Sequence, residues 1–158
     1  MRTKKITCDY ARLRENILPQ LRETVFHVTS GEGLAGIRSE KMILPNTNGR
    51  FNCSYPQSAN SFGIKRKYIC LFDLRDVSEK IIDITLDKFH FLSHHEWDIN
   101  AFLILDAEAC RNLIPNEAAK TEPHEIWIPK VEVWFPAPIP LERISSIIEV
   151  QVNKQTGE

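Results

Sequence analysis

The sequence predicts an α+β domain built on a mostly antiparallel sheet. Segments with the β-branched and aromatic composition of strands outnumber segments with helical spacing, and clusters of Gly, Pro, Asn and Ser separate them. The chain contains no internal repeat and no low-complexity tract. With 158 residues and 42% hydrophobic content, we expect one domain that buries about 68–70% of the surface of the unfolded chain.

Composition argues against several classes of protein. The 20 basic and 21 acidic residues leave a net charge of −1, so no bulk electrostatic field favours nucleic acid or a membrane surface. No apolar run approaches the roughly 18 residues of a membrane span, and residues 1–9 turn polar before a signal-peptide core could form. We therefore expect a cytoplasmic protein with no membrane partner. Four scattered cysteines lack metal-ligand spacing, so we expect reduced thiols and no metal centre: Cys8, Cys53, Cys70 and Cys110.

Residues 1–23 are predicted to form a helix packed on the main domain, which spans residues 24–158. Asp9 suits the N-cap position of this helix. The apolar side chains that follow recur at helical intervals: Leu13, Ile17, Leu18 and Leu21. Because Pro19 interrupts the pattern, we expect a kink or an early end there.

The next stretch joins a strand to a helix and supplies the first candidate for a functional site. Residues 25–30 have strong β-propensity and carry His27, and their last two residues are a Thr-Ser pair suited to an N-cap. Helical spacing follows at Leu34 and Ile37. His27 is thus a titratable side chain on a strand that is followed directly by a helix, and such a junction is a candidate functional site.

Residues 46–63 are rich in turn formers and without periodicity, which predicts a long loop that serves either as a binding loop or as a plain surface loop. After the loop, short apolar and β-rich runs predict strands at 67–74, 81–86, 101–105, 125–128, 131–135 and 147–152. Helical turns are expected at 106–113 and, after Pro140, at 141–144.

Three residues on separate predicted strands form the candidate constellation: His27, Tyr68 and Glu132. Strand alternation places Glu132 on one face with Lys130 and Trp134, and it places the intervening apolar side chains towards the core. A carboxylate between apolar neighbours must be exposed or paired, so Glu132 is a plausible wall of a cleft.

This order resembles the ADP-ribosyltransferase fold, in which a histidine on the first strand, an aromatic residue on a middle strand and a glutamate on a late strand surround NAD. The likeness covers roughly residues 24–152. The motifs that carry it are Phe26-His27-Val28-Thr29 with the Met42-Ile43-Leu44-Pro45 turn, Tyr68-Ile69-Cys70-Leu71-Phe72, and residues 131–135 followed by residues 139–144. The last two are similar to segments of the DarT-like branch, which modifies bases of single-stranded DNA. The resemblance implies two packed, mostly antiparallel sheets that form a cleft, with a few flanking helices.

The resemblance also implies the chemistry. NAD would be the substrate, and Glu132 would hold its ribose hydroxyl and stabilise the positive charge that develops as the nicotinamide bond breaks. His27 would hold the adenosine-side ribose, Thr29 or Ser30 could assist, and Tyr68 would stack on nicotinamide. Arg50 would pair with the pyrophosphate, with Arg38 and Arg66 as alternatives. Lys41 departs from the pattern, because the family commonly has glycine there.

Other interpretations stay open. The same fold could be a non-catalytic module that binds a nucleotide or a protein. The RNA 2′-phosphotransferases share the fold and consume NAD, but Glu132 argues against them. A cluster of ligand-type residues could be a metal site, a substrate-side group or a solvated turn: His90, His94, His95, Glu96 and Asp98.

The acceptor of a transferred ADP-ribose could be a protein or a nucleic acid. Binding to a nucleic acid would need a basic rim beside aromatic side chains: Lys65, Arg66 and Lys67 with Phe51, Tyr55 and Phe62. The resemblance to the DarT-like branch further implies a toxin with a neutralising partner.

Overall fold

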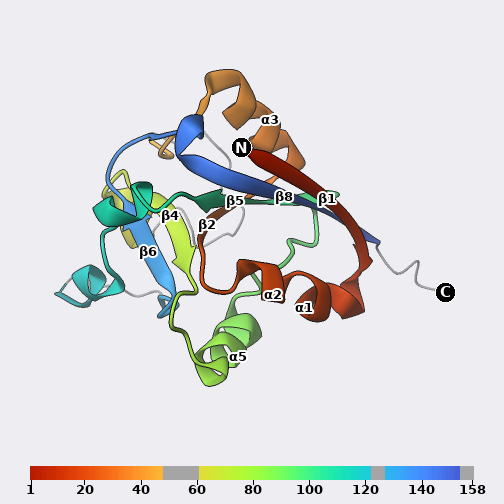
Figure 1. The fold of residues 1–158 in the computed structure, drawn as a ribbon. Helices are drawn as coiled ribbons and strands as arrows, with labels where there is room; N and C mark the ends of the chain where they lie inside the picture. The colour runs from red at the N-terminus through yellow and green to blue at the C-terminus, as the bar shows by residue number, and fades with distance from the viewer. Residues whose placement is uncertain (48–60, 122–126, 154–158) are drawn as a thin grey trace.

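The computed structural model describes residues 1–47, 61–121 and 127–153 and confirms a mixed α+β fold (Figure 1). A six-stranded sheet has the order β1-β8-β5-β2-β4-β6, and a two-stranded sheet pairs β3 with β7. The strands are β1 Arg2–Asp9, β2 Val25–Ser30, β3 Met42–Ile43, β4 Ile69–Asp73, β5 Ile99–Leu105, β6 Glu132–Phe135, β7 Ile139–Pro140 and β8 Ile144–Asn153. All pairs in both sheets are antiparallel except β1 with β8, which is parallel.

The helices are short and lie between the strands. The α-helices are α1 Leu13–Asn16, α2 Leu18–Leu21, α3 Gly31–Glu40, α4 Phe62–Lys65 and α5 Glu79–Lys88, and the 3-10 helices are η1 Tyr10–Arg12, η3 Ala109–Asn112, η4 Asn116–Thr121 and η5 Leu141–Arg143. In the described part of the chain, no helix has the length and apolar character needed to cross a membrane. The helical turns predicted after Asp106 and Pro140 are confirmed by η3 and η5.

The N-terminal segment differs from the predicted single helix. Residues 2–9 form β1, which the sequence conceals because only two of its residues, Ile6 and Cys8, contact the core. The predicted helix is divided into η1, α1 and α2, and the expected break is present because the chain leaves helical hydrogen bonding near Ile17, with Pro19 in the first turn of α2. Since β1 is hydrogen-bonded to β8 over eight residue pairs, this segment joins the main sheet directly.

The prediction of a strand at 81–86 is wrong, because these residues belong to α5. Ser78 caps the helix by accepting a hydrogen bond from the backbone N–H of Ile81. Ile82 and Thr85 are buried three residues apart on one helical face, a spacing that a short run of isoleucines conceals. Of the strand predicted at 125–128, residues 125 and 126 lie outside the described residues, and Trp127 and Ile128 are irregular.

The sheet is covered on both faces. On one face, Phe26, Phe72 and Phe102 pack with residues of α1, α2 and α5. On the other face, Leu71 and Leu103 pack with residues of α3. Figure 1 shows α3 on one side of the sheet and α1, α2 and α5 on the other.

Strands β2 and β4 separate soon after they meet, and this separation positions the site. They share only two residue pairs, Val25 with Asp73 and Phe26 with Phe72. Beyond Phe26, β2 continues along β5 as far as Ser30, while the other end of β4 stays paired with β6. The sheet therefore opens between β2 and β4 on the side where His27 lies.

Candidate active site

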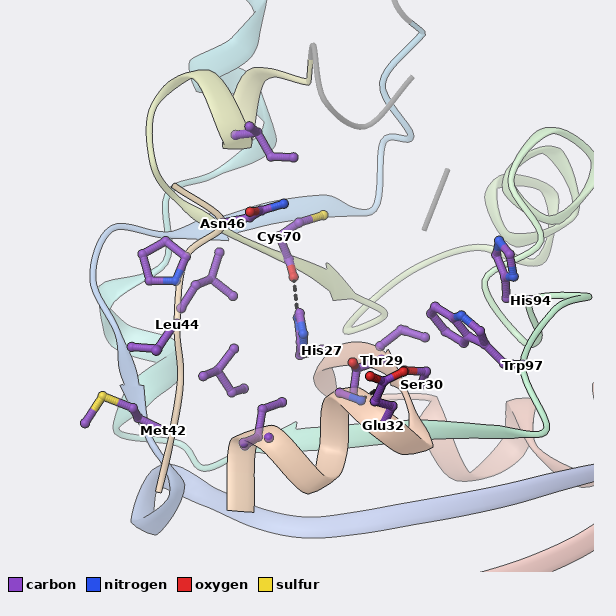
Figure 2. A pocket seen from close by; sticks show the side chains of 18 of the residues that line it. His27, Thr29, Ser30, Glu32, Met42, Leu44, Asn46, Cys70, His94 and Trp97 are labelled. Atoms are coloured by element: carbon purple, nitrogen blue, oxygen red, sulfur yellow. Dashed lines mark hydrogen bonds between the residues drawn. The ribbon is translucent and has the colours of Figure 1, made fainter. Parts of the chain in front are cut away.

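A cavity of about 950 Å³ lies where β2 and β4 separate (Figure 2). Its walls come from β2, α3, the segment 42–46, β4 with the residue before it, and the connection that follows α5. The volume is at the upper end of the range of about 300–1,000 Å³ that is usual for ligand pockets. Of the residues predicted for NAD binding, His27, Thr29, Ser30 and Tyr68 line this cavity.

His27 bridges the gap between the two strands. Its Nδ1 lies 3.0 Å from the backbone oxygen of Cys70. Because a carbonyl oxygen only accepts hydrogen bonds, Nδ1 must carry the proton and donate. Burial lowers the pKa of His27, and the hydrogen bond to Cys70 opposes the fall. The imidazole is therefore neutral at pH 7, and its Nε2 is a hydrogen-bond acceptor suited to a hydroxyl group.

Thr29 and Ser30 lie at the junction of β2 and α3. Ser30 caps α3, since its Oγ accepts a hydrogen bond of 3.0 Å from the backbone N–H of Gly33. Gly33 is required here, because a Cβ at this position would lie 2.0 Å from Thr29 Oγ1. The close approach of the helix therefore holds the Thr29 hydroxyl at the cavity wall.

This junction gives a matched pair of substitutions. We expect Gly33→Ala to lower the free energy of unfolding by about 1–3 kcal/mol, because the new methyl group forces Thr29 out of place. Gly36→Ala, on the same helix, meets no atom within 4 Å and should raise the free energy of unfolding by about 0.5–1 kcal/mol. Urea unfolding of both variants measures the difference; equal effects would contradict the close packing at Gly33.

Glu132 lies on β6, beyond Cys70 as seen from His27. Its Oε1 accepts hydrogen bonds from Cys70 Sγ at 3.2 Å and from Trp134 Nε1 at 3.1 Å. Glu132 does not itself line the cavity, but Cys70 does. Cys70 thus joins the two predicted residues, since its carbonyl bonds His27 and its thiol bonds Glu132.

Burial raises the pKa of Glu132, and the hydrogen bonds from Cys70 and Trp134 oppose the rise. Burial also raises the pKa of Cys70 well above its ordinary value, and the nearby Glu132 adds to the effect. The thiol therefore stays protonated and acts as a donor. A carboxylate held in this environment at an electrostatic cost is typical of a functional group.

Strand alternation predicted Trp134 on the face of Glu132 and away from the core, but its side chain belongs to the core. The indole is fully buried, with the Phe62 ring centroid 4.6 Å from its own. A Cβ on Gly63 would lie 2.7 Å from the Trp134 ring, so only glycine fits at that position. Trp134 therefore supports Glu132 from within the core.

Tyr68 and Cys70 share the cavity wall. Tyr68 directly precedes β4, and its ring centroid lies 6.2 Å from that of Phe62. Cys70 was expected to be a reduced thiol and was not assigned to the site. The strand period, which puts it on one face with Tyr68, is the signal that could have assigned it to the cavity.

The three candidate arginines differ in their positions. Arg50 lies outside the described residues. Arg38 pairs with Glu149 at 2.7 Å, and the Arg66 guanidinium stacks 5.3 Å from the Phe62 ring centroid. Neither Arg38 nor Arg66 lines the cavity. Among the described lining residues, no lysine or arginine is present, whereas three carboxylates are: Glu32, Glu40 and Glu96.

The histidines after α5 do not share a helix face, because the segment 89–98 is not helical. His94 lines the cavity, His90 stacks on Tyr10 with ring centroids 5.5 Å apart, and His95 is exposed. Among the described ranges of the chain, no group of three or more His, Cys, Asp and Glu residues is arranged to hold a metal ion. The structure thus gives the predicted alternative of a metal site no support in those ranges.

The chain matches no protein-family model, no curated protein and no solved structure. The functional argument therefore depends on the geometry of the site and on the motifs of the sequence.

Proposed function

We propose that this protein is an NAD-dependent ADP-ribosyltransferase that moves ADP-ribose from NAD to a macromolecular acceptor. The observation that carries the proposal is the order of three strands in the sheet. His27, Tyr68 with Cys70, and Glu132 come from segments far apart in the chain, yet β2, β4 and β6 are successive neighbours. This is the arrangement that the resemblance to the ADP-ribosyltransferase fold implies. Lys41 adds a detail, since its φ of 58° is a backbone conformation that favours the glycine common in the family.

The geometry supports the chemistry of breaking the bond between nicotinamide and ribose. The transition state of such a cleavage carries positive charge on the sugar, as in glycoside hydrolysis. Glu132, held in place by Cys70 and Trp134, lies next to the cavity-lining Cys70 and would stabilise that charge. The Nε2 of His27 would accept a ribose hydroxyl, and Tyr68 would face the nicotinamide ring. The transferred group leaves nicotinamide and forms a new bond to a nucleophile of the acceptor, which loses a proton.

The acceptor is proposed only by class. Lys65, Arg66 and Lys67 form a short basic run at the end of α4, but Phe62 packs against Trp134 and Arg66 stacks on Phe62. The other aromatic residues expected beside this rim, Phe51 and Tyr55, lie outside the described residues. A nucleic-acid base and a protein side chain therefore remain the two candidate acceptors, and the experiment tests both.

The test is incubation with NAD labelled in its adenosine half, together with separate pools of single-stranded DNA, RNA and cell protein. We expect release of free nicotinamide and transfer of the label to one pool, which names the acceptor. Binding of NAD without release of nicotinamide would instead support a non-catalytic nucleotide-binding module. No binding and no release would overturn the proposal.

His27→Ala is expected to raise the KM for NAD about tenfold, because the ribose loses a hydrogen-bond acceptor and the Cys70 carbonyl loses its donor. His95→Ala is the matched control, since the His95 side chain is 85% exposed and does not line the cavity. Nicotinamide release measured over a range of NAD concentrations separates KM from kcat. An unchanged KM in His27→Ala would exclude His27 from binding.

A further inference from the structure

One end of the cavity carries a stack of three aromatic rings. The His94 ring lies 4.8 Å from the Trp97 ring and 4.8 Å from the His95 ring, at interplanar angles of 27° and 21°. Both Trp97 and His94 line the cavity, whereas His95 does not. Figure 2 shows Trp97 and His94 at the end of the cavity near Thr29, Ser30 and Glu32, away from Asn46 and Cys70.

This stack is held in place before any ligand arrives. His94 is buried, and its backbone N–H donates to Oδ1 of the buried Asn100 at 2.8 Å. His94 Nδ1 accepts a hydrogen bond from the backbone N–H of Glu96, and the backbone N–H of Trp97 donates to the His94 carbonyl. Trp97 is therefore a half-buried ring on a fixed support, which is the form that stacking platforms for nucleobases take.

The polar groups around Trp97 select the kind of ring that fits. Glu32 and Glu96 line the same cavity, and Glu96 Oε1 lies 3.7 Å from His95 Nε2. Carboxylates only accept hydrogen bonds, so they favour a ring with an exocyclic amino group over one with a carbonyl in the same place. Adenine carries such an amino group, whereas hypoxanthine has an oxygen there.

We propose that Trp97 is the stacking platform for the adenine ring of the nucleotide substrate, and that the carboxylates of Glu32 and Glu96 accept from its amino group. The inference rests on the proposed function, which places the nicotinamide ribose at the Cys70 and Glu132 end and so leaves the opposite end for adenosine. His27 lies between the two ends, where a ribose hydroxyl is expected (Figure 2).

The test uses adenosine and inosine, which are uncharged and differ in the group at position 6 of the purine. Titration calorimetry of the whole protein should show that Trp97→Ala weakens adenosine binding about tenfold or more, and that Trp97→Phe, which keeps an aromatic face, retains most of it. Trp127→Ala is the matched control, because this tryptophan is 42% exposed, does not line the cavity and stacks with Lys88. Adenosine should also quench the fluorescence of the wild type and of Trp127→Phe, but not that of Trp97→Phe.

Inosine should bind the wild type about tenfold more weakly than adenosine, and the difference should shrink when Glu32 and Glu96 are both changed to Gln. Equal adenosine affinity in Trp97→Ala and wild type, or no adenosine binding at all, would overturn the assignment of Trp97. Equal affinity of the wild type for the two nucleosides would overturn the role of the carboxylates.

The binding of adenosine can be measured whether or not the protein turns over NAD. If adenosine binds at Trp97 but no nicotinamide is released, the proposed activity is wrong and the assignment of Trp97 stands. If nicotinamide is released and Trp97→Ala has an unchanged KM for NAD, the assignment of Trp97 is wrong and the proposed activity stands.

Discussion

Glu132→Gln is expected to lower nicotinamide release from NAD about 100- to 1,000-fold while leaving the fold intact. Loss of one preorganised electrostatic contact to a transition state typically costs about 2.7–4 kcal/mol. Glutamine keeps the shape of the side chain, and its amide oxygen can still accept from Cys70 Sγ and Trp134 Nε1. The variant therefore removes the charge and little else.

The same substitution should also change how the free energy of unfolding depends on pH. Because burial raises the pKa of Glu132, the folded protein holds the carboxyl proton more tightly than the unfolded chain does. The contribution of this group to the free energy of unfolding is thus full at low pH and is lost as the pH rises through the raised pKa. Glutamine has no proton to lose, so its stability relative to wild type should increase from pH 4 to pH 8.

Urea unfolding at several pH values, together with nicotinamide release, checks both effects. Glu142→Gln is the control, because this glutamate is exposed on η5 and does not line the cavity. Retained activity in Glu132→Gln would remove Glu132 from the catalytic step. A stability difference that does not change with pH would contradict the buried carboxylate.

Trp134→Ala is expected to lower the free energy of unfolding by about 3–5 kcal/mol. The indole is fully buried against Phe62, so its removal leaves a cavity in the core. Removing it also takes one hydrogen-bond donor from Glu132. Thermal or urea unfolding measures the loss, and a cost below about 1 kcal/mol would contradict the packing described for this residue.

Trp134→Phe separates the packing of the indole from its hydrogen bond. Phenylalanine keeps an aromatic ring in the core, so the loss of stability should be smaller than in Trp134→Ala. Without the indole N–H, one of the two hydrogen bonds that oppose the raised pKa of Glu132 is gone, so that pKa should rise further. The acidic limb of the pH profile of nicotinamide release should move to higher pH, and a profile identical to that of the wild type would show that the hydrogen bond has no effect on Glu132.

Much of the sheet was predictable from the sequence, because strands such as β2, β4 and β6 are short runs of apolar, β-branched and aromatic residues bounded by turn residues. The errors have physical causes. The run 81–86 contains three isoleucines, and the serine cap and the burial of α5 outweigh their β-propensity. Residues 2–9 look like solvated chain because β1 gains its stability from pairing with a distant strand.

The sequence likewise predicts only part of the candidate site. His27 and Glu132 could be predicted because they are polar residues on apolar strands and lie in the motifs that resemble the ADP-ribosyltransferase fold. The link between them through Cys70, and the platform at Trp97, depend on which strands become neighbours and on how one turn folds. Those are long-range consequences that local spacing does not encode, and only the coordinates of the whole sheet reveal them.

The pairing of β1 with β8 places the first and last strands of the described chain side by side, and Asn153 Nδ2 donates a hydrogen bond of 3.0 Å to Asp9 Oδ1. During synthesis on the ribosome, β1 therefore cannot pair with its neighbour until residues 144–153 have emerged. Such a late, sequence-distant closure slows folding and leaves an open strand edge exposed to other nascent chains in the meantime.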